Sequence, residues 1–154
     1  MSNLTLTKRQ ALILFTAPFA IALGSRHALA GLPSVKAYRN PGCGCCEKWS
    51  GLMKDAGFAI IMEDDPNLAD RKASLGVPTE IAGCHTAIIG EYVIEGHVPP
   101  ADVIKFLNES NKALGLAVPG MPAESPGMEA SGTAEKYDVL LFTKDGKSSI
   151  YASH

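Results

Sequence analysis

Short runs with alternating or helical apolar spacing follow one another along residues 31–154. Residues 35–38 alternate between apolar and polar side chains, which predicts a first strand. Apolar side chains then recur at helical spacing over residues 45–56, and Gly57 predicts the end of that helix. The short apolar run over residues 58–62 is typical of a buried second strand. The chain thus begins as strand, helix, strand.

The succession of helices and strands continues towards the C-terminus. Asp65-Pro66 predicts the start of a second helix. Two apolar runs around Gly90-Glu91 predict a hairpin with a two-residue turn, and Pro99-Pro100 opens a last helix. The order β-α-β-α-β-β-α indicates an α/β fold, and over residues 35–110 it resembles the thioredoxin arrangement.

A segment rich in proline, glycine, alanine and serine follows this core. Residues 112–136 hold two Pro-Gly-Met units, which place Met121 and Met128 in a stiff, Met-containing loop. Long irregular segments in compact domains are usually functional or disordered, and a plain linker with two incidental methionines is the alternative. Residues 137–152 contain Asp145-Gly146 between two apolar runs, which predicts a closing β-hairpin.

The N-terminal segment is typical of an exported protein. Residues 1–30 combine Lys8-Arg9, an apolar run and a small-residue cleavage pattern, which predicts an export signal and a single mature domain over residues 31–154. The apolar run is shorter than the ~20 residues needed to span a bilayer, so we expect no membrane segment after cleavage. We expect a periplasmic protein, and the segment leaves secretory and twin-arginine export both open.

The charge of the chain excludes nucleic acid as a partner. Loss of residues 1–30 would change the formal net charge from −2 to about −5, because three cations and no acids are removed. No lysine or arginine cluster remains to follow phosphates, and one tryptophan is available for stacking.

Three of the four cysteines, Cys43, Cys45 and Cys46, stand close together. They fall on the first turn of the first predicted helix, where unpaired backbone N–H groups and the helix dipole favour thiolate over thiol. The Cys43/Cys46 spacing occurs in redox dithiols and in thiolate metal sites, while Cys45 adds a sulfur that a dithiol enzyme does not need. The cluster therefore indicates either a metal site or a redox pair.

Cys84 is remote in sequence but is predicted to face this cluster. In the thioredoxin arrangement the turn entering the third strand packs against the start of the first helix, and here that turn contains Cys84 and His85. Thioredoxins carry a cis-proline just before this strand, whereas the nearest proline, Pro78, lies six residues before Cys84. A further potential ligand replaces that proline, which favours metal binding over ordinary disulfide exchange.

The donor atoms of the predicted site suit copper. Thiolates and thioethers are soft ligands that select Cu(I), zinc or iron–sulfur clusters. Structural zinc sites usually use two C-x-x-C-like pairs, which the three-plus-one pattern does not match. We therefore expect a Cu(I) site, which could hold more than one ion. Four cysteines are the expected ligands, and one histidine and two methionines are further potential ligands: Cys43, Cys45, Cys46, Cys84, His85, Met121 and Met128.

Two other interpretations of the cysteines stay open. One is a thiol–disulfide oxidoreductase in which Cys43 attacks and Cys46 resolves. The other is a pair of structural disulfides, since exported cysteines normally meet an oxidising compartment, although neighbours on one helical turn are poor partners for two bridges. His97 is interpreted as a surface or strand-end histidine, and Trp49 as a core residue.

Five motifs span nearly the whole mature chain: residues 38–49, 76–78, 84–87, 92–99 and 115–129. They closely resemble the CopG copper-resistance proteins, a family long described as a predicted metal-binding domain of unknown function. The resemblance implies a thioredoxin-like periplasmic protein that binds copper through the four cysteines and acts alongside other periplasmic copper-resistance proteins. It also implies interconversion of Cu(I) and Cu(II), and leaves open whether the protein is an enzyme, a copper oxidoreductase.

Overall fold

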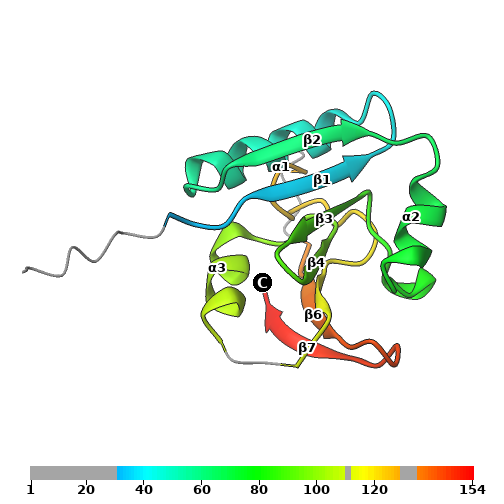
Figure 1. The fold of residues 1–154 in the computed structure, drawn as a ribbon. Coiled ribbons are helices and arrows are strands. Elements are labelled where there is room, and N and C mark those ends of the chain that lie inside the picture. Colours follow the sequence, from blue (N-terminus) through cyan, green and yellow to red (C-terminus); the bar gives the residue numbers. More distant parts are fainter. Residues whose placement is uncertain (1–30, 110–111, 129–134) are drawn as a thin grey trace, which may run out of the picture. The chain divides into compact units, whose positions relative to one another are not determined.

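The computed structural model describes residues 31–109, 112–128 and 135–154, and the predicted export signal lies outside them. Within these ranges the chain forms one sheet of seven strands and three α-helices (Figure 1). The strands are β1 (Val35–Arg39), β2 (Ile60–Asp64), β3 (His85–Ile89), β4 (Tyr92–Glu95), β5 (Gly115–Ala117), β6 (Asp138–Phe142) and β7 (Ser148–Ser153). The helices are α1 (Gly44–Asp55), α2 (Leu68–Ser74) and α3 (Pro100–Asn108).

The strands lie in the order β2-β1-β3-β4-β5-β6-β7. β1 pairs parallel with β2 and antiparallel with β3, and β3 continues into β4 through a hairpin in which Gly90 has a φ of 60°. The α/β class and the β-α-β-α-β-β-α succession are therefore confirmed, and the thioredoxin-like assignment stays a prediction. This order brings the N-terminal end of α1 and the residues that enter β3 to the same edge of the core.

Each face of the sheet buries its own apolar cluster. On one face, Trp49 of α1 and Phe106 of α3 pack with inward residues such as Ala87 and Ile89 of β3. On the other face, the segment that follows α2 packs on β4 and β6 through a second cluster: Val77, Ile81, Val93, Leu114, Ala117 and Phe142. Alternating side chains of one strand point to opposite faces, so β4 contributes Ile94 to the first cluster and Val93 to the second. Trp49 is a core residue, as predicted.

Helix boundaries follow local capping chemistry. Helix α1 ends in a Schellman arrangement: Gly57 has a φ of 101°, and the Phe58 N–H donates to the Met53 carbonyl at 3.0 Å. This cap uses Phe58, so β2 starts later than the apolar run predicts. Helix α2 also starts later than predicted, because the Asp65 carboxylate accepts the Asn67 N–H at 2.9 Å in a turn that precedes it.

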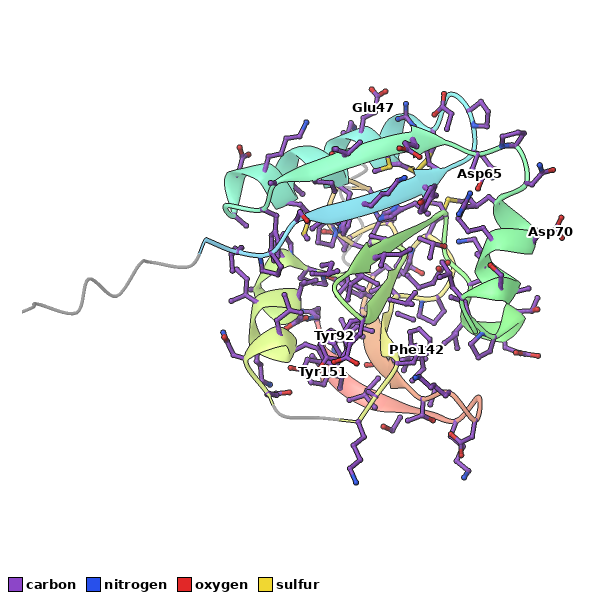
Figure 2. All side chains as sticks on the ribbon, in the orientation of Figure 1. Glu47, Asp65, Asp70, Tyr92, Phe142 and Tyr151 are labelled. Carbon is purple, nitrogen blue, oxygen red and sulfur yellow. A yellow bond between two sulfur atoms is a disulfide. The ribbon has the colours of Figure 1, made fainter. Side chains whose placement is uncertain are left out.

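The C-terminal part of the chain adds strands to the core sheet. β5 lies inside the segment predicted as an irregular loop, and pairs parallel with β4 and antiparallel with β6. β6 and β7 form an antiparallel hairpin. Tyr92 and Tyr151 lie beside α3 (Figure 2), with ring centroids 4.9 and 6.2 Å from that of Phe106. None of the helices in the described ranges has the length and apolar character required of a membrane span.

Candidate metal centre

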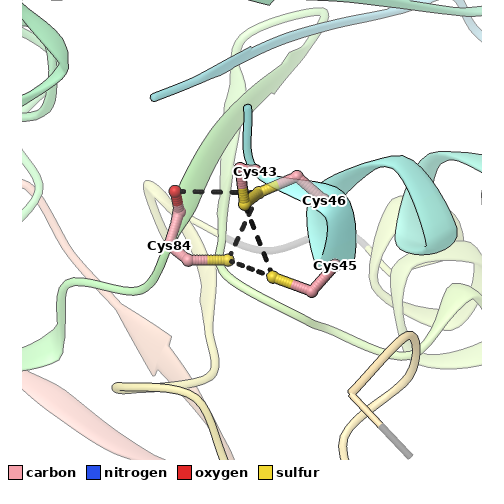
Figure 3. A group of neighbouring side chains, drawn as sticks. All are labelled: Cys43, Cys45, Cys46 and Cys84. Carbon is pink, nitrogen blue, oxygen red and sulfur yellow. Dashed lines mark hydrogen bonds between the residues drawn. A yellow bond between two sulfur atoms is a disulfide. The ribbon is translucent and has the colours of Figure 1, made fainter. Parts of the chain in front are cut away.

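The fold brings the four cysteines together at the N-terminal end of α1. Cys43 is the N-cap residue, Cys45 and Cys46 lie in the first turn, and Cys84 immediately precedes β3. The Cys84 Sγ lies 3.4 Å from the Cys46 Sγ and 3.8 Å from the Cys45 Sγ, and the Cys43 and Cys45 sulfurs are 3.4 Å apart (Figure 3). The prediction that Cys84 faces the cluster is confirmed. Arg39 donates to the Cys43 carbonyl at 3.0 Å and so ties β1 to the N-cap.

Cys43 and Cys46 form a disulfide, whereas Cys45 and Cys84 are free thiols. The interpretation with two structural bridges is therefore not realised in this structure. A bonded pair offers no thiolate, so this oxidation state leaves two of the four predicted cysteine ligands available. Reduction by two electrons and two protons would restore all four thiols.

Burial governs the protonation of Cys84. Burial raises the pKa of Cys84 to about 12, and the charge interaction and hydrogen bond with Cys45 add to this rise. The positive charge of Lys72 acts in the opposite direction. The Cys84 thiol is thus protonated at neutral pH, whereas the expectation of thiolate concerned the three cysteines at the start of α1 and did not include Cys84. A metal ion must displace that proton, so metal affinity should increase with pH.

His85 is fully buried and lies against the cysteines. Its Nδ1 is 3.5 Å from the Cys84 Sγ, and its ring packs on Trp49 with centroids 4.2 Å apart. Burial, together with the charges of His97 and Lys72, lowers the pKa of His85 well below 6.5, so the imidazole is neutral. Among the described side chains, its Nε2 is a buried nitrogen with no hydrogen-bond partner.

His97 is fully buried in the site, so its interpretation as a surface residue is wrong, although it does lie just after the end of β4. Its Nε2 lies 2.7 Å from the Cys84 Sγ, and its Nδ1 lies 2.7 Å from the carbonyl oxygen of Pro126. Because a carbonyl only accepts, Nδ1 carries the proton, and in the neutral ring Nε2 accepts from the Cys84 thiol. The cue in the sequence was the position of His97 two residues after an apolar strand and beside Val98-Pro99.

A buried ion pair that the sequence did not indicate supports the turn before Cys84. Lys72 of α2 forms an ion pair with the fully buried Glu95 of β4. Glu95 also accepts the Gly83 N–H at 2.7 Å and the Thr86 hydroxyl at 2.6 Å. Burial raises the pKa of Glu95, while Lys72 and these hydrogen bonds oppose the rise. The carboxylate thus holds the backbone of Gly83 and the side chain of Thr86, which lie on either side of Cys84.

The first Pro-Gly-Met unit lies along the same turn. Gly120 forms a parallel bridge with Gly83, and its N–H donates to the Ala82 carbonyl at 3.1 Å. The next residue, Met121, is 58% exposed and lines a hollow of about 480 Å³ together with Cys43 and Cys84. Met121 is therefore placed at the entrance of the cysteine site, and its role as a ligand stays a prediction.

The second Pro-Gly-Met unit packs on α1. Gly127 has a φ of 86°, and a Cβ at this position would lie 2.8 Å from the Trp49 N and 3.1 Å from the Cys45 carbonyl oxygen. This close approach delivers the Pro126 carbonyl to His97. Met128 is half-buried and ends the turn, with its N–H donating to the Ser125 carbonyl at 2.8 Å. Its role as a ligand also stays a prediction.

Solved structures with a similar fold and sequence carry a copper-related name. Two structures of "Copper resistance protein copG", described as Form 1 and Form 2, match with a TM-score of 0.76 and 35% sequence identity. Each match covers 80% of this chain and 98% of the other. Residues 81–128 match the family described as "Protein of unknown function, DUF411". No curated protein matches the chain.

Proposed function

The chain belongs to the family of the copper resistance protein CopG, and from this premise we propose that it is a copper-binding protein of metal resistance. The observation that carries the proposal is the convergence of four cysteine sulfurs, from the start of α1 and the turn before β3, in one group. The donor set fits a soft ion, since thiolates select Cu(I) over hard cations.

In this proposal the reduced protein holds Cu(I) as cargo through Cys43, Cys45, Cys46 and Cys84. Sulfurs already 3.4 to 3.8 Å apart can bridge neighbouring ions, which supports a multinuclear site. The buried Cys84 thiol loses its proton when the ion arrives. Met121, at the edge of the hollow beside Cys43 and Cys84, is the thioether best placed to deliver the ion.

The proposal places the protein in the periplasm, in support of copper resistance and next to other proteins that handle the metal. The basis is the export signal predicted for residues 1–30. The same compartment is oxidising, which agrees with a Cys43–Cys46 disulfide as one working state of the protein.

The Cys43/Cys46 pair also supports interconversion of Cu(I) and Cu(II). Two Cu(II) ions that each take one electron would convert the two thiols of Cys43 and Cys46 into the disulfide, with release of two protons. The reverse step would oxidise two Cu(I) ions while the disulfide takes up two electrons and two protons. In both directions the electrons pass between the bound copper ions and the sulfurs of Cys43 and Cys46, so no other redox partner is needed.

The test is an anaerobic titration of the fully reduced protein with Cu(I) against a chelator of moderate affinity. We expect the protein to remove Cu(I) from the chelator, and Cys45→Ser and Cys84→Ser to weaken this competition by at least about tenfold, because each removes one thiolate ligand. A reduced wild-type protein that takes up no Cu(I) would sink the proposal.

A thiol–disulfide oxidoreductase is the second candidate, and the Cys43–Cys46 disulfide favours it. This function needs only the C-x-x-C pair, so disulfide turnover should survive Cys45→Ser and Cys84→Ser. The two variants therefore separate the candidates: they reduce copper binding if the first is correct, and leave the turnover of a small disulfide substrate unchanged if the second is correct.

A further inference from the structure

Cys84, His85 and His97 form a second group of ligand atoms beside the four sulfurs, with all three atoms within 4.8 Å of one another. We propose that this group is a mixed sulfur–nitrogen site for a divalent transition-metal ion, Cu(II) in particular, that shares Cys84 with the thiolate site. One thiolate and two imidazoles are the donors found in Cu(II) electron-transfer sites. The identity of the metal rests on the proposed function, whereas the existence of the site does not.

His97 has the orientation of a metal-ligating histidine. A ligating imidazole almost always donates its second ring N–H to a carboxylate, a carbonyl or water, which fixes the tautomer and the direction of the free lone pair. Here the Pro126 carbonyl takes the Nδ1 proton at 2.7 Å, and the Nε2 lone pair points at the Cys84 sulfur, also at 2.7 Å. The second Pro-Gly-Met unit therefore contributes through its backbone carbonyl.

His85 supplies the second nitrogen. Bond lengths of about 2.3 Å to sulfur and 2.0–2.1 Å to nitrogen place two ligands of a tetrahedral ion about 3.5 Å apart. The His85 Nδ1 already lies 3.5 Å from the Cys84 Sγ, while His97 would have to move away from that sulfur by less than about 1 Å. Binding through Nδ1 places the ring proton on Nε2, a fully buried nitrogen with no hydrogen-bond partner among the described side chains.

The mixed site does not depend on the oxidation state of Cys43 and Cys46. Their disulfide removes two sulfurs from the four-cysteine group but none from the group of Cys84, His85 and His97. Imidazole suits divalent ions such as Zn, Cu and Ni, whereas an all-thiolate site suits Cu(I). The disulfide state should therefore keep a site for a divalent ion after losing most of its capacity for Cu(I), and the hollow that reaches Cys84 gives access to it.

Co(II) is the probe of choice, because it is a divalent ion that does not exchange electrons with the Cys45 and Cys84 thiols during the titration. The purified protein, with two free thiols confirmed by counting, is titrated anaerobically with Co(II) and followed by visible absorption. We expect one equivalent to bind and to produce a thiolate-to-Co(II) charge-transfer band. Cobalt-edge X-ray absorption on the same wild-type sample should show nitrogen ligands beside one sulfur. Absence of the band, or a shell of sulfur alone, would overturn the proposal without reference to any variant.

Variants then assign the ligands. His97→Gln should lower Co(II) affinity by at least about tenfold, whereas His154→Gln, which removes an imidazole near the C-terminus, should leave it unchanged. Circular dichroism checks that each variant is folded. Cys84→Ser should abolish the charge-transfer band, because it removes the one sulfur of the mixed site. Co(II) binding by the disulfide form and Cu(I) binding by the reduced form are measured separately, so either proposal can fail alone. Unchanged affinity in a folded His97→Gln protein, or an unchanged charge-transfer band in a folded Cys84→Ser protein, would contradict the mixed site.

Discussion

Single buried polar residues set the chemistry of this site. Cys84 and His85 lie next to each other in sequence, yet burial has opposite effects on their pKa values: it raises that of the thiol and lowers that of the imidazole. Both groups are therefore neutral in the metal-free protein. Neutral imidazole is ready to bind a metal, while the thiol must first release a proton.

Because His85 is buried in its neutral form, the stability of the protein should depend on pH. Its pKa in the folded state lies well below 6.5, so near and below that pH the unfolded chain binds more protons than the native one. The free energy of unfolding should therefore fall as pH decreases below about 6.5, by at most about 1.4 kcal/mol per pH unit from this group. Urea unfolding of the metal-free protein at several pH values measures the slope.

The matched variant is His85→Leu, which removes the titrating ring and keeps an apolar side chain in contact with Trp49. Its stability should depend less on pH than that of the wild type over the same range. Equal slopes in the two proteins would show that His85 does not titrate on unfolding.

Two kinds of element position the ligands. The start of α1 carries three cysteines as one rigid group, because helical geometry fixes their spacing. The segment from β5 to Met128 has little regular structure, yet it lies against both halves of the site: Gly120 against Gly83, and Gly127 against α1. The segment predicted as a Met-containing loop thus acts on the site through its backbone.

Gly127→Ala tests this role of the segment. The new Cβ would meet the Trp49 backbone nitrogen at 2.8 Å, in addition to the strain of a φ of 86°. We expect a loss of about 2–4 kcal/mol in the free energy of unfolding, together with weaker metal binding because the Pro126 carbonyl moves away from His97.

Gly120→Ala is the control for backbone strain alone. Gly120 also has a positive φ, 67°, but a Cβ there has no heavy atom within 4 Å. It should cost only about 1 kcal/mol, the strain of a left-handed residue. Denaturant unfolding of both variants gives the comparison, and equal losses would mean that the contact with α1 is unimportant.

At the scale of the whole molecule, metal binding couples parts of the chain that are distant in sequence. Cys46 and Cys84 belong to α1 and to the entry of β3, and His97 follows β4. An ion that bridges these elements binds the native state and has no preformed site in the unfolded chain, so it must stabilise the fold.

Reduced protein with free Cu(I) held at 100 times the dissociation constant should gain about 2.7 kcal/mol of stability. The disulfide form should gain much less from Cu(I), because two of its four sulfurs are bonded to each other. Thermal unfolding under anaerobic conditions measures both. A reduced Cys84→Ser protein that shows the full increase would place the ion elsewhere.

The sequence by itself determined the elements and most of the sulfur ligands. Local signals were sufficient for β1, α1 and the β3–β4 hairpin, because apolar period, glycine stops and turn pairs act over a few neighbouring residues. The chemistry of Cys43, Cys45 and Cys46 was visible for the same reason. Cys84 could be added once the order of the elements was known, since that order brings the turn before β3 to the start of α1.

Tertiary structure alone decided the rest of the site. The hydrogen bond of His97 to Pro126 joins residues 29 positions apart, and the ion pair of Lys72 with Glu95 joins residues 23 positions apart. No local pattern reports these contacts or the burial of His97. β5 also went unpredicted, because a three-residue strand is specified by its neighbours β4 and β6 and not by its own sequence. Packing between distant segments determines which polar side chains are buried and therefore which of them can act together.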